Sequence, residues 1–197
     1  GLCPERGHAG LFQRIAQAKQ QRPELKIVVI DPRRTMTCEI ADLHLPVRSG
    51  SDVWLFNALL AYLHQQGHFS NDFIASHTEG LDEALRVARE TAGDLKQVAT
   101  ACGLDTERLL QFYRMFADHQ RVMTAFSMGV NESSAGTDKV NSIINCHLLT
   151  GRIGQPGPRG RGVGDEAREG LDVVQSFHAG RDGCVESGLV PGDIGGE

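Results

Sequence analysis

The chain has 197 residues, of which 40% are apolar and 6% aromatic, and its formal net charge is −5 at pH 7. This length fits one α/β domain or one lobe of something larger, and the acidic balance gives no electrostatic footprint for nucleic acid. No apolar run approaches the roughly 20 residues that a membrane helix needs. We therefore expect neither a nucleic-acid partner nor a membrane partner.

The number and spacing of the cysteines bear on metal binding and on the redox state of the compartment. The five cysteines are scattered and form no CxxC pair, so we expect no zinc site, no iron–sulfur site and no metal ligand in this chain. Such usage is typical of a reducing compartment, which predicts a cytoplasmic protein. The sequence has no initiator Met, which favours a fragment or a processed piece.

The first part of the chain alternates helix and strand. Apolar spacing predicts a helix over 11–21, and Pro23 ends it. The β-branched run 25–30 is typical of a buried parallel strand, and a second short strand is predicted over 43–47. This alternation indicates an α/β fold built on a parallel sheet.

A long helix is predicted over 53–66, directly after Ser49-Gly50-Ser51-Asp52. We expect a Ser or Asp of that segment to cap the helix. Apolar side chains surround the helix almost completely, which is typical of a helix enclosed between layers. A run of shorter helices is then predicted over 70–119.

A strand, a polar loop and a helix follow, and they are the most informative pattern in the chain. An apolar strand over 122–128 leads into the loop Gly129–Gly136, and a helix over 138–149 comes next. From residue 158 onward the sequence is rich in glycine and holds one aromatic residue, Phe177. Residues 158–197 are therefore predicted to be poorly ordered.

Polar residues follow three of the predicted strands at their carboxyl ends, where open α/β sheets bind ligands. The carboxylate of Asp31 can accept from a ribose hydroxyl or a guanine edge, and Arg33 and Arg34 can hold phosphate bidentately. The loop 131–137 precedes a helix whose positive end suits an anion. Each segment also fits a structural role: residues 31–35 as a solvated loop, residues 49–52 as a helix cap, and Thr137 or Asp138 as the N-cap of the next helix. The residues alone leave both interpretations open.

Three sequence blocks together resemble the molybdopterin oxidoreductases that carry a Mo-bis(molybdopterin guanine dinucleotide) cofactor, abbreviated bis-MGD. The blocks are 26–52 (KIVVIDPRRTMTCEIADLHLPVRSGSD), 127–157 (SMGVNESSAGTDKVNSIINCHLLTGRIGQPG) and the weaker 11–19 (LFQRIAQAK). Within that family they are most similar to the catalytic subunits of bacterial assimilatory nitrate reductases. The resemblance divides the chain into a divergent end, 1–10, an α/β cofactor-binding segment, 11–157, and a disordered or frame-shifted tail, 158–197.

The resemblance implies a fold, a cofactor and a reaction. The fold is a Rossmann-like three-layer αβα arrangement with a parallel sheet, part of the formate dehydrogenase/DMSO reductase type. The full-length enzyme would reduce nitrate to nitrite in nitrate assimilation. Its electrons would come from an unidentified donor protein or domain through a 4Fe–4S cluster whose ligands lie outside this chain. No catalytic residue is expected here, and this segment alone would be inactive.

The resemblance also assigns cofactor contacts. Residues that match the guanosine-contacting segments of the family are Asp31, Pro32, Arg33, Arg34, Thr35, Gly50, Ser51 and Asp52. Residues that match the loop beneath the pterin are Met128, Gly129, Asn131 and Glu132. We expect these segments to converge from neighbouring strand ends on one guanine-tipped molybdenum cofactor.

The sequence departs from the family pattern in places. Relatives have Gln where this chain has Glu132, and a carboxylate there adds negative charge beside an anionic cofactor. Periplasmic nitrate reductases have Arg at the position of Ala135, which favours the cytoplasmic branch. Similarity is lost abruptly at both ends, which predicts reading-frame errors or a damaged partial clone.

Three alternatives stay open. The chain could derive from a formate dehydrogenase or a periplasmic nitrate reductase of the same family. It could be a stand-alone nucleotide-binding module, in which Asp31, Arg33 and Arg34 grip an NADPH-type ligand. It could also be a truncated product without function.

Overall fold

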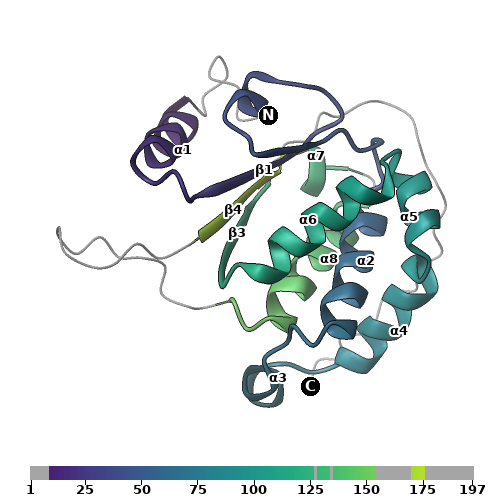
Figure 1. Ribbon diagram of the computed structural model, residues 1–197. Helices are drawn as coiled ribbons and strands as arrows, with labels where there is room; N and C mark the ends of the chain where they lie inside the picture. The colour runs from purple at the N-terminus through teal and green to yellow at the C-terminus, as the bar shows by residue number, and fades with distance from the viewer. Residues whose placement is uncertain (1–8, 127, 134, 154–169, 176–197) are drawn as a thin grey trace.

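The computed structural model describes residues 9–126, 128–133, 135–153 and 170–175 (Figure 1). In chain order the elements are α1 (Ala9–Gln21), β1 (Lys26–Ile30), the 3-10 helix η1 (Met36–Glu39), β2 (Leu43–Leu45), α2 (Asp52–Gln65), α3 (Asn71–His77), α4 (Leu81–Ala92), α5 (Leu95–Cys102), α6 (Thr106–Asp118), β3 (Arg121–Ala125), α7 (Met128–Asn131), α8 (Gly136–Leu149) and β4 (Gly170–Gln175). None of the helices in these ranges is long and apolar enough to cross a membrane.

The four described strands form one parallel sheet in the order β2-β1-β4-β3. β4 lies between β1 and β3, and its Val173 pairs with Val28 on one side and Thr124 on the other. Because every pair is parallel, the carboxyl ends of all four strands lie at the same edge of the sheet. The loops that leave β1, β2 and β3 therefore start on one side of the protein.

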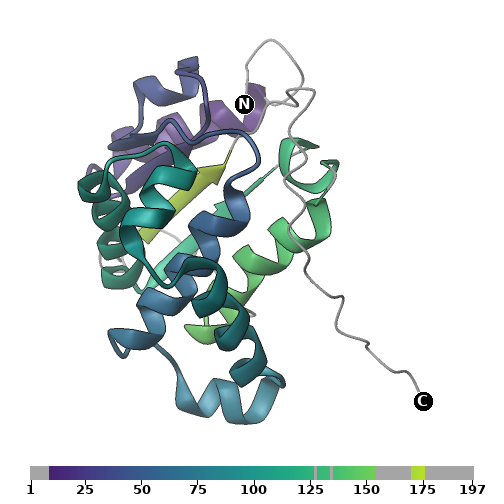
Figure 2. The same cartoon turned by 90° about the vertical axis from the view of Figure 1, so that its right-hand side faces the viewer.

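β1 is buried on both faces, as a strand inside a parallel sheet should be. Ile27 and Val29 pack with Ile15 of α1 and Cys38 of η1. Val28 and Ile30, on the opposite face of β1, belong to the larger core. Figures 1 and 2 show α1 on one side of the sheet and the group α2, α6 and α8 on the other. The alternation of side chains along β1 thus holds helices against both faces.

The larger core is built around α2, which packs against α4, α5, α6 and α8. Tyr113 of α6 is fully buried, and its hydroxyl donates to the carbonyl of Leu55 in α2 at 2.9 Å. Phe56 and Phe112 meet edge to face with ring centroids 6.2 Å apart, a favourable aromatic geometry. The expectation that this helix is enclosed on nearly all sides is confirmed.

Two expectations about strands are corrected. The strand expected over 122–128 ends at Ala125, and Met128 instead begins the short helix α7. The prediction of poor order over 158–197 is wrong for 170–175, which form β4, because this β-branched run finds hydrogen-bonding partners on both β1 and β3. The rest of that range, and residues 1–8, lie outside the part that the structure describes.

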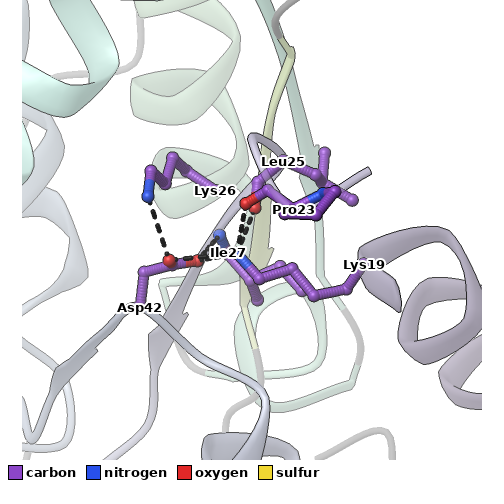
Figure 3. A network of polar contacts seen from close by, with 6 residues as sticks. All are labelled: Lys19, Pro23, Leu25, Lys26, Ile27 and Asp42. Atoms are coloured by element: carbon purple, nitrogen blue, oxygen red, sulfur yellow. Dashed lines mark hydrogen bonds and ion pairs between the residues drawn. The ribbon is translucent and has the colours of Figure 1, made fainter. Parts of the chain in front are cut away.

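Asp42 joins α1, β1 and β2 at the amino edge of the sheet (Figure 3). Its carboxylate lies 2.7 Å from Nζ of Lys19 and 3.3 Å from Nζ of Lys26, and it accepts the backbone N–H of Ile27 at 2.8 Å. Lys19 also donates to the carbonyl of Leu25. Partial burial opposes ionisation, but the hydrogen bonds from Lys19 and Ile27 prevail and lower the pKa of Asp42.

We expect Asp42→Asn to destabilise the fold by about 1 kcal/mol near neutral pH, because the pairs are partly solvent-screened. Folding lowers the pKa of Asp42 below 3.8, so this stabilisation is present above about pH 4 and is lost as the pH falls through the folded-state value. Denaturant unfolding of both proteins from pH 7 to pH 2.5 measures it. Unfolding free energies whose difference does not shrink below about pH 4 would contradict the assignment.

Candidate functional site

The turn after β1 is organised by a buried carboxylate. Asp31 is 0% exposed, and its Oδ1 accepts the backbone N–H of Arg33 at 2.8 Å. The backbone N–H of Asp31 donates to the carbonyl of Leu45 at 3.2 Å, and its carbonyl lies 2.9 Å from Nε2 of His44. Arg33 and Arg34 are both exposed. Asp31 therefore fixes the shape of the turn, while two guanidinium groups remain accessible to an anionic ligand.

Pro32 and Thr35, in the same turn, are half-buried. The hydroxyl of Thr35 lies 3.9 Å from Sγ of Cys38, and its carbonyl accepts the backbone N–H of Cys38 at 2.9 Å. Cys38 belongs to the small core on the α1 side of the sheet. These contacts tie the far end of the turn to η1, so the turn is anchored on both sides of its arginines.

The turn before α2 is closed by Ser51, whose backbone N–H and hydroxyl both donate to the carbonyl of Arg48. Gly50 has φ of +87°, a conformation that favours glycine, and it is exposed. Ser51 occupies the N-cap position of α2, but its hydroxyl donates back to the carbonyl of Arg48 at 2.6 Å and makes no cap hydrogen bond. The expected side-chain cap from Ser51 is therefore wrong, because the hydroxyl is used to close the turn. The side chain at the N-cap position of α2 therefore accepts no hydrogen bond from the first backbone N–H groups of the helix.

The buried thiol of Cys102 packs against this turn. Cys102 at the end of α5 is 0% exposed, and its Sγ lies 3.8 Å from the carbonyl of Ser51. Burial raises the pKa of the Cys102 thiol to about 11, which keeps it protonated and able to donate. The backbone N–H of Arg48 donates to the carbonyl of Cys102 at 2.7 Å. The β2–α2 turn thus rests on α5.

The segment after β3 is a helical turn rather than an open loop. Within α7, Gly129 is half-buried and Asn131 is exposed, and Glu132 directly after it is exposed too. The side chain of Met128 lies outside the described part of the structure. Of the residues predicted for this loop, Asn131 and Glu132 are the ones with accessible polar side chains.

α8 begins at Gly136, with Ala135 in the N-cap position and no side-chain cap. The expected cap from Thr137 or Asp138 is wrong, because both residues already lie inside the first turn of the helix. Gly136, the first residue of α8, packs directly on the last residue of α7. A Cβ at Gly136 would lie 2.2 Å from the carbonyl oxygen of Asn131, which no real side chain could accept.

A buried ion pair joins α2 to α8, and the sequence analysis missed it. Nζ of Lys139 lies 3.0 Å from Oδ2 of Asp52, and their side chains are 8% and 0% exposed. The spacing of Lys139, Ile143 and Cys146 in the sequence places all three on one face of a helix. In the structure this face of α8 is buried. A lysine on the apolar face of a helix predicts a charged partner.

The structure brings all three candidate segments to the carboxyl edge of the sheet, but two of them are not direct neighbours. β4 lies between the strand that leads to Asp31 and the strand that leads to α7. Neighbouring strands are about 4.8 Å apart, so these two segments start roughly 10 Å apart. In the ranges that the structure describes, no group of three His, Cys, Asp or Glu residues could hold a metal ion.

We expect Gly136→Ala to push α7 away from α8 and to destabilise the fold by about 1–3 kcal/mol, as overpacked sites do. Thr137→Ala, at the exposed neighbouring position, is the matched control and should cost much less. Denaturant unfolding of the three proteins gives the comparison. Equal stability of the Gly136→Ala and Thr137→Ala variants would show that α7 does not pack on Gly136 as described.

Comparison with known proteins identifies relatives of this chain that are named nitrate reductase or formate dehydrogenase, two of which are described here. A nitrate reductase of Klebsiella oxytoca is 45% identical over 150 residues, which cover 76% of this chain and 16% of that protein. Formate dehydrogenase H of Escherichia coli is 30% identical over 156 residues, covering 79% of this chain and 21% of that protein. The chain thus spans about a fifth or less of the length of these relatives.

The fold has a solved counterpart. The acetylene hydratase of Pelobacter acetylenicus superposes with a TM-score of 0.68 over 75% of this chain and 20% of that one, at 22% sequence identity. The family described as molybdopterin oxidoreductase matches residues 4–194. This match over most of the sequence confirms the resemblance, and the chain belongs to the molybdopterin oxidoreductase family.

Proposed function

We propose that the chain is a segment of a nitrate reductase catalytic subunit that reduces nitrate to nitrite and that it supplies part of a bis-MGD site. One observation carries the proposal: three polar segments lie at one edge of a parallel sheet, in a chain 45% identical to a nitrate reductase. Nitrate reductases of two bacteria share 45% and 44% identity with it, against 34% and 30% for two formate dehydrogenases.

The residues present fit a long, anionic, nucleotide-tipped ligand. A separation of roughly 10 Å between the segments suits a dinucleotide-sized group better than a single phosphate. We assign the phosphates or the guanine edge to the exposed Arg33 and Arg34, and close backbone approach to Gly50. Asn131 and Glu132 would face the pterin side. Asp31 and Asp52, which the resemblance assigns to cofactor contact, are buried, so we propose that their carboxylates shape the turns of the site and that exposed neighbours touch the ligand.

The first turns of α2 and α8 add to this fit. Neither helix has a side-chain cap from its N-cap residue, so their leading N–H groups suit an anion. When bound, the molybdenum cofactor supplies the two-electron chemistry, and the protein supplies binding and orientation. These residues would hold the anionic nucleotide arm of the cofactor in a fixed place.

The wider setting follows from the same proposal. The segment would belong to a Rossmann-like three-layer αβα domain of the formate dehydrogenase/DMSO reductase type. The full-length enzyme would work in nitrate assimilation in the cytoplasm. It would take electrons from a donor protein or domain through a 4Fe–4S cluster held elsewhere, with neither nucleic acid nor membrane as a partner.

Formate oxidation is the second candidate. An F420-dependent formate dehydrogenase subunit of Methanococcus maripaludis is 34% identical over 150 residues, and the Escherichia coli relative is also named a formate dehydrogenase.

A periplasmic nitrate reductase of Desulfovibrio desulfuricans is 33% identical over 165 residues. Ala135, in place of the Arg expected of periplasmic enzymes, is the residue that favours the assimilatory branch.

We expect the full-length protein, produced with molybdate, to contain molybdenum and to release GMP on acid hydrolysis. It should oxidise reduced viologen with nitrate and leave formate unchanged. The measurements are metal analysis, nucleotide chromatography and the two assays. Formate oxidation without nitrate reduction would favour the second candidate, and NADPH binding without molybdenum or GMP would replace the proposal with the nucleotide-module alternative.

We expect Arg33→Ala and Arg34→Ala in the full-length protein each to lower GMP retention by about tenfold, because each removes a charge-assisted contact. Arg14→Ala, an exposed arginine of α1, is the matched control and should retain the wild-type amount. The readout is GMP per protein after gel filtration. Wild-type retention in both Arg33→Ala and Arg34→Ala would remove these residues from the site.

A further inference from the structure

We propose that Lys139 is a positioning residue: its ion pair with Asp52 fixes the turn before α2 relative to the turn before α8, and thereby sets how tightly the cofactor is held. This inference rests on the proposed function and deepens it. Lys139 would act through Asp52 and the two helix starts, without touching the cofactor. The argument has three steps: the location of the pair, its connections and its electrostatics.

The pair sits where the two helices begin. Asp52 is the first residue of α2 and Lys139 lies in the first turn of α8, and these helices pack against each other. The Nζ–Oδ2 distance is 3.0 Å, and both side chains are almost fully buried. In the described part of the chain, the buried charged residues are Asp31, Asp52 and Lys139, so Lys139 is the buried cation among them.

Both ends of the pair connect rigidly to the candidate site. On the α2 side, Asp52 directly follows Ser51, whose hydroxyl holds the Gly50 turn closed. On the α8 side, the backbone N–H of Lys139 donates to the carbonyl of Ala135 at 3.0 Å. Gly136 in between packs on Asn131 of α7 without room for a methyl group. A shift of Lys139 would therefore move α7 and its exposed polar residues relative to the Gly50 turn.

Electrostatics indicates that this pair is not there for stability alone. A cation in the first turn of α8 opposes the helix dipole, and burying a lysine and a carboxylate removes both from water. Apolar residues of similar volume often stabilise a fold as well as a buried ion pair does. An ion pair differs from such a packing because it holds two particular groups at a short distance, here 3.0 Å, which is what a site shared between two helix starts requires.

The test uses the full-length holoenzyme and compares Lys139→Met, Lys139→Arg, the apolar pair Asp52→Leu/Lys139→Met and the charge swap Asp52→Lys/Lys139→Asp. Lys96→Met, at an exposed lysine of α5, is the control for loss of a positive charge. Each protein is assayed for GMP and molybdenum content, for the rate of GMP loss after dilution, and for melting temperature. Activity is not needed as a readout.

We expect Lys139→Met and the apolar pair to lose GMP about tenfold faster, because small misplacements of binding groups have effects of that order or more. Relative to Lys139→Met, the apolar pair should restore the melting temperature but not GMP retention, and the charge swap should restore both. Lys139→Arg should keep both at wild-type values. Recovery of retention in the apolar pair would overturn the inference, since packing alone would then suffice. Failure of the charge swap, if it folds, would also overturn it, because Asp52 would then be a direct ligand.

Failure of the inference can be told apart from failure of the proposed function. If the wild-type protein contains no molybdenum and no GMP, the proposed function is wrong. If the wild-type protein contains both and Lys139→Met retains them as Lys96→Met does, the function stands and the role of Lys139 is refuted. A melting temperature lowered in Lys139→Met with normal GMP retention would likewise reduce the pair to a stability contact.

Discussion

Parallel pairing of β4 with both β1 and β3 determines where every candidate residue lies. Because the pairing is parallel, the turns after β1, β2 and β3 all leave from the same edge. Without β4 between them, β1 and β3 would share no hydrogen-bonded partner among the described strands, and nothing in the sheet would hold the two turns at one edge. The inserted strand also sets a minimum separation, roughly two strand spacings, between the Asp31 turn and α7. The candidate site is thus wide, and it suits a long ligand.

Charge is distributed unevenly over this framework. The interior between β1 and helices α2, α6 and α8 is apolar and aromatic. In the described residues, the buried charged groups are Asp31, Asp52 and Lys139, and each belongs to a segment at the carboxyl edge. Burying a charge costs free energy unless the charge is paired and hydrogen-bonded. Because this fold places its buried charges at one edge, the positions of the groups at that edge are narrowly constrained. At the opposite edge, the charged group that joins the elements is Asp42, which is partly exposed and pairs with Lys19 and Lys26.

Sequence reasoning succeeded where local pattern decides structure. β1 and α2 were predictable because a β-branched run and a nearly all-round apolar helix each have one stable environment, and the carboxyl-edge position of Asp31 follows from β1. It failed where tertiary contacts decide. Met128 follows an apolar strand, yet it begins α7, which packs closely on Gly136 of α8. β4 lies in a glycine-rich stretch, and its structure comes from partners distant in sequence. The pairing of Lys139 needed the relative placement of two helices, which no local pattern contains.

The order of the strands has a consequence for how the protein is made. β1 and β3 leave the ribosome before residues 170–175, yet among the strands that the structure describes it is these residues that join them into one sheet. Until then the nascent chain carries two strands with open edges, and unpaired edges are templates for joining other chains. Joining β1 to β3 is therefore a long-range event, and long-range parallel pairing is intrinsically slow. During that interval the unpaired strand edges leave the polypeptide exposed to misassembly.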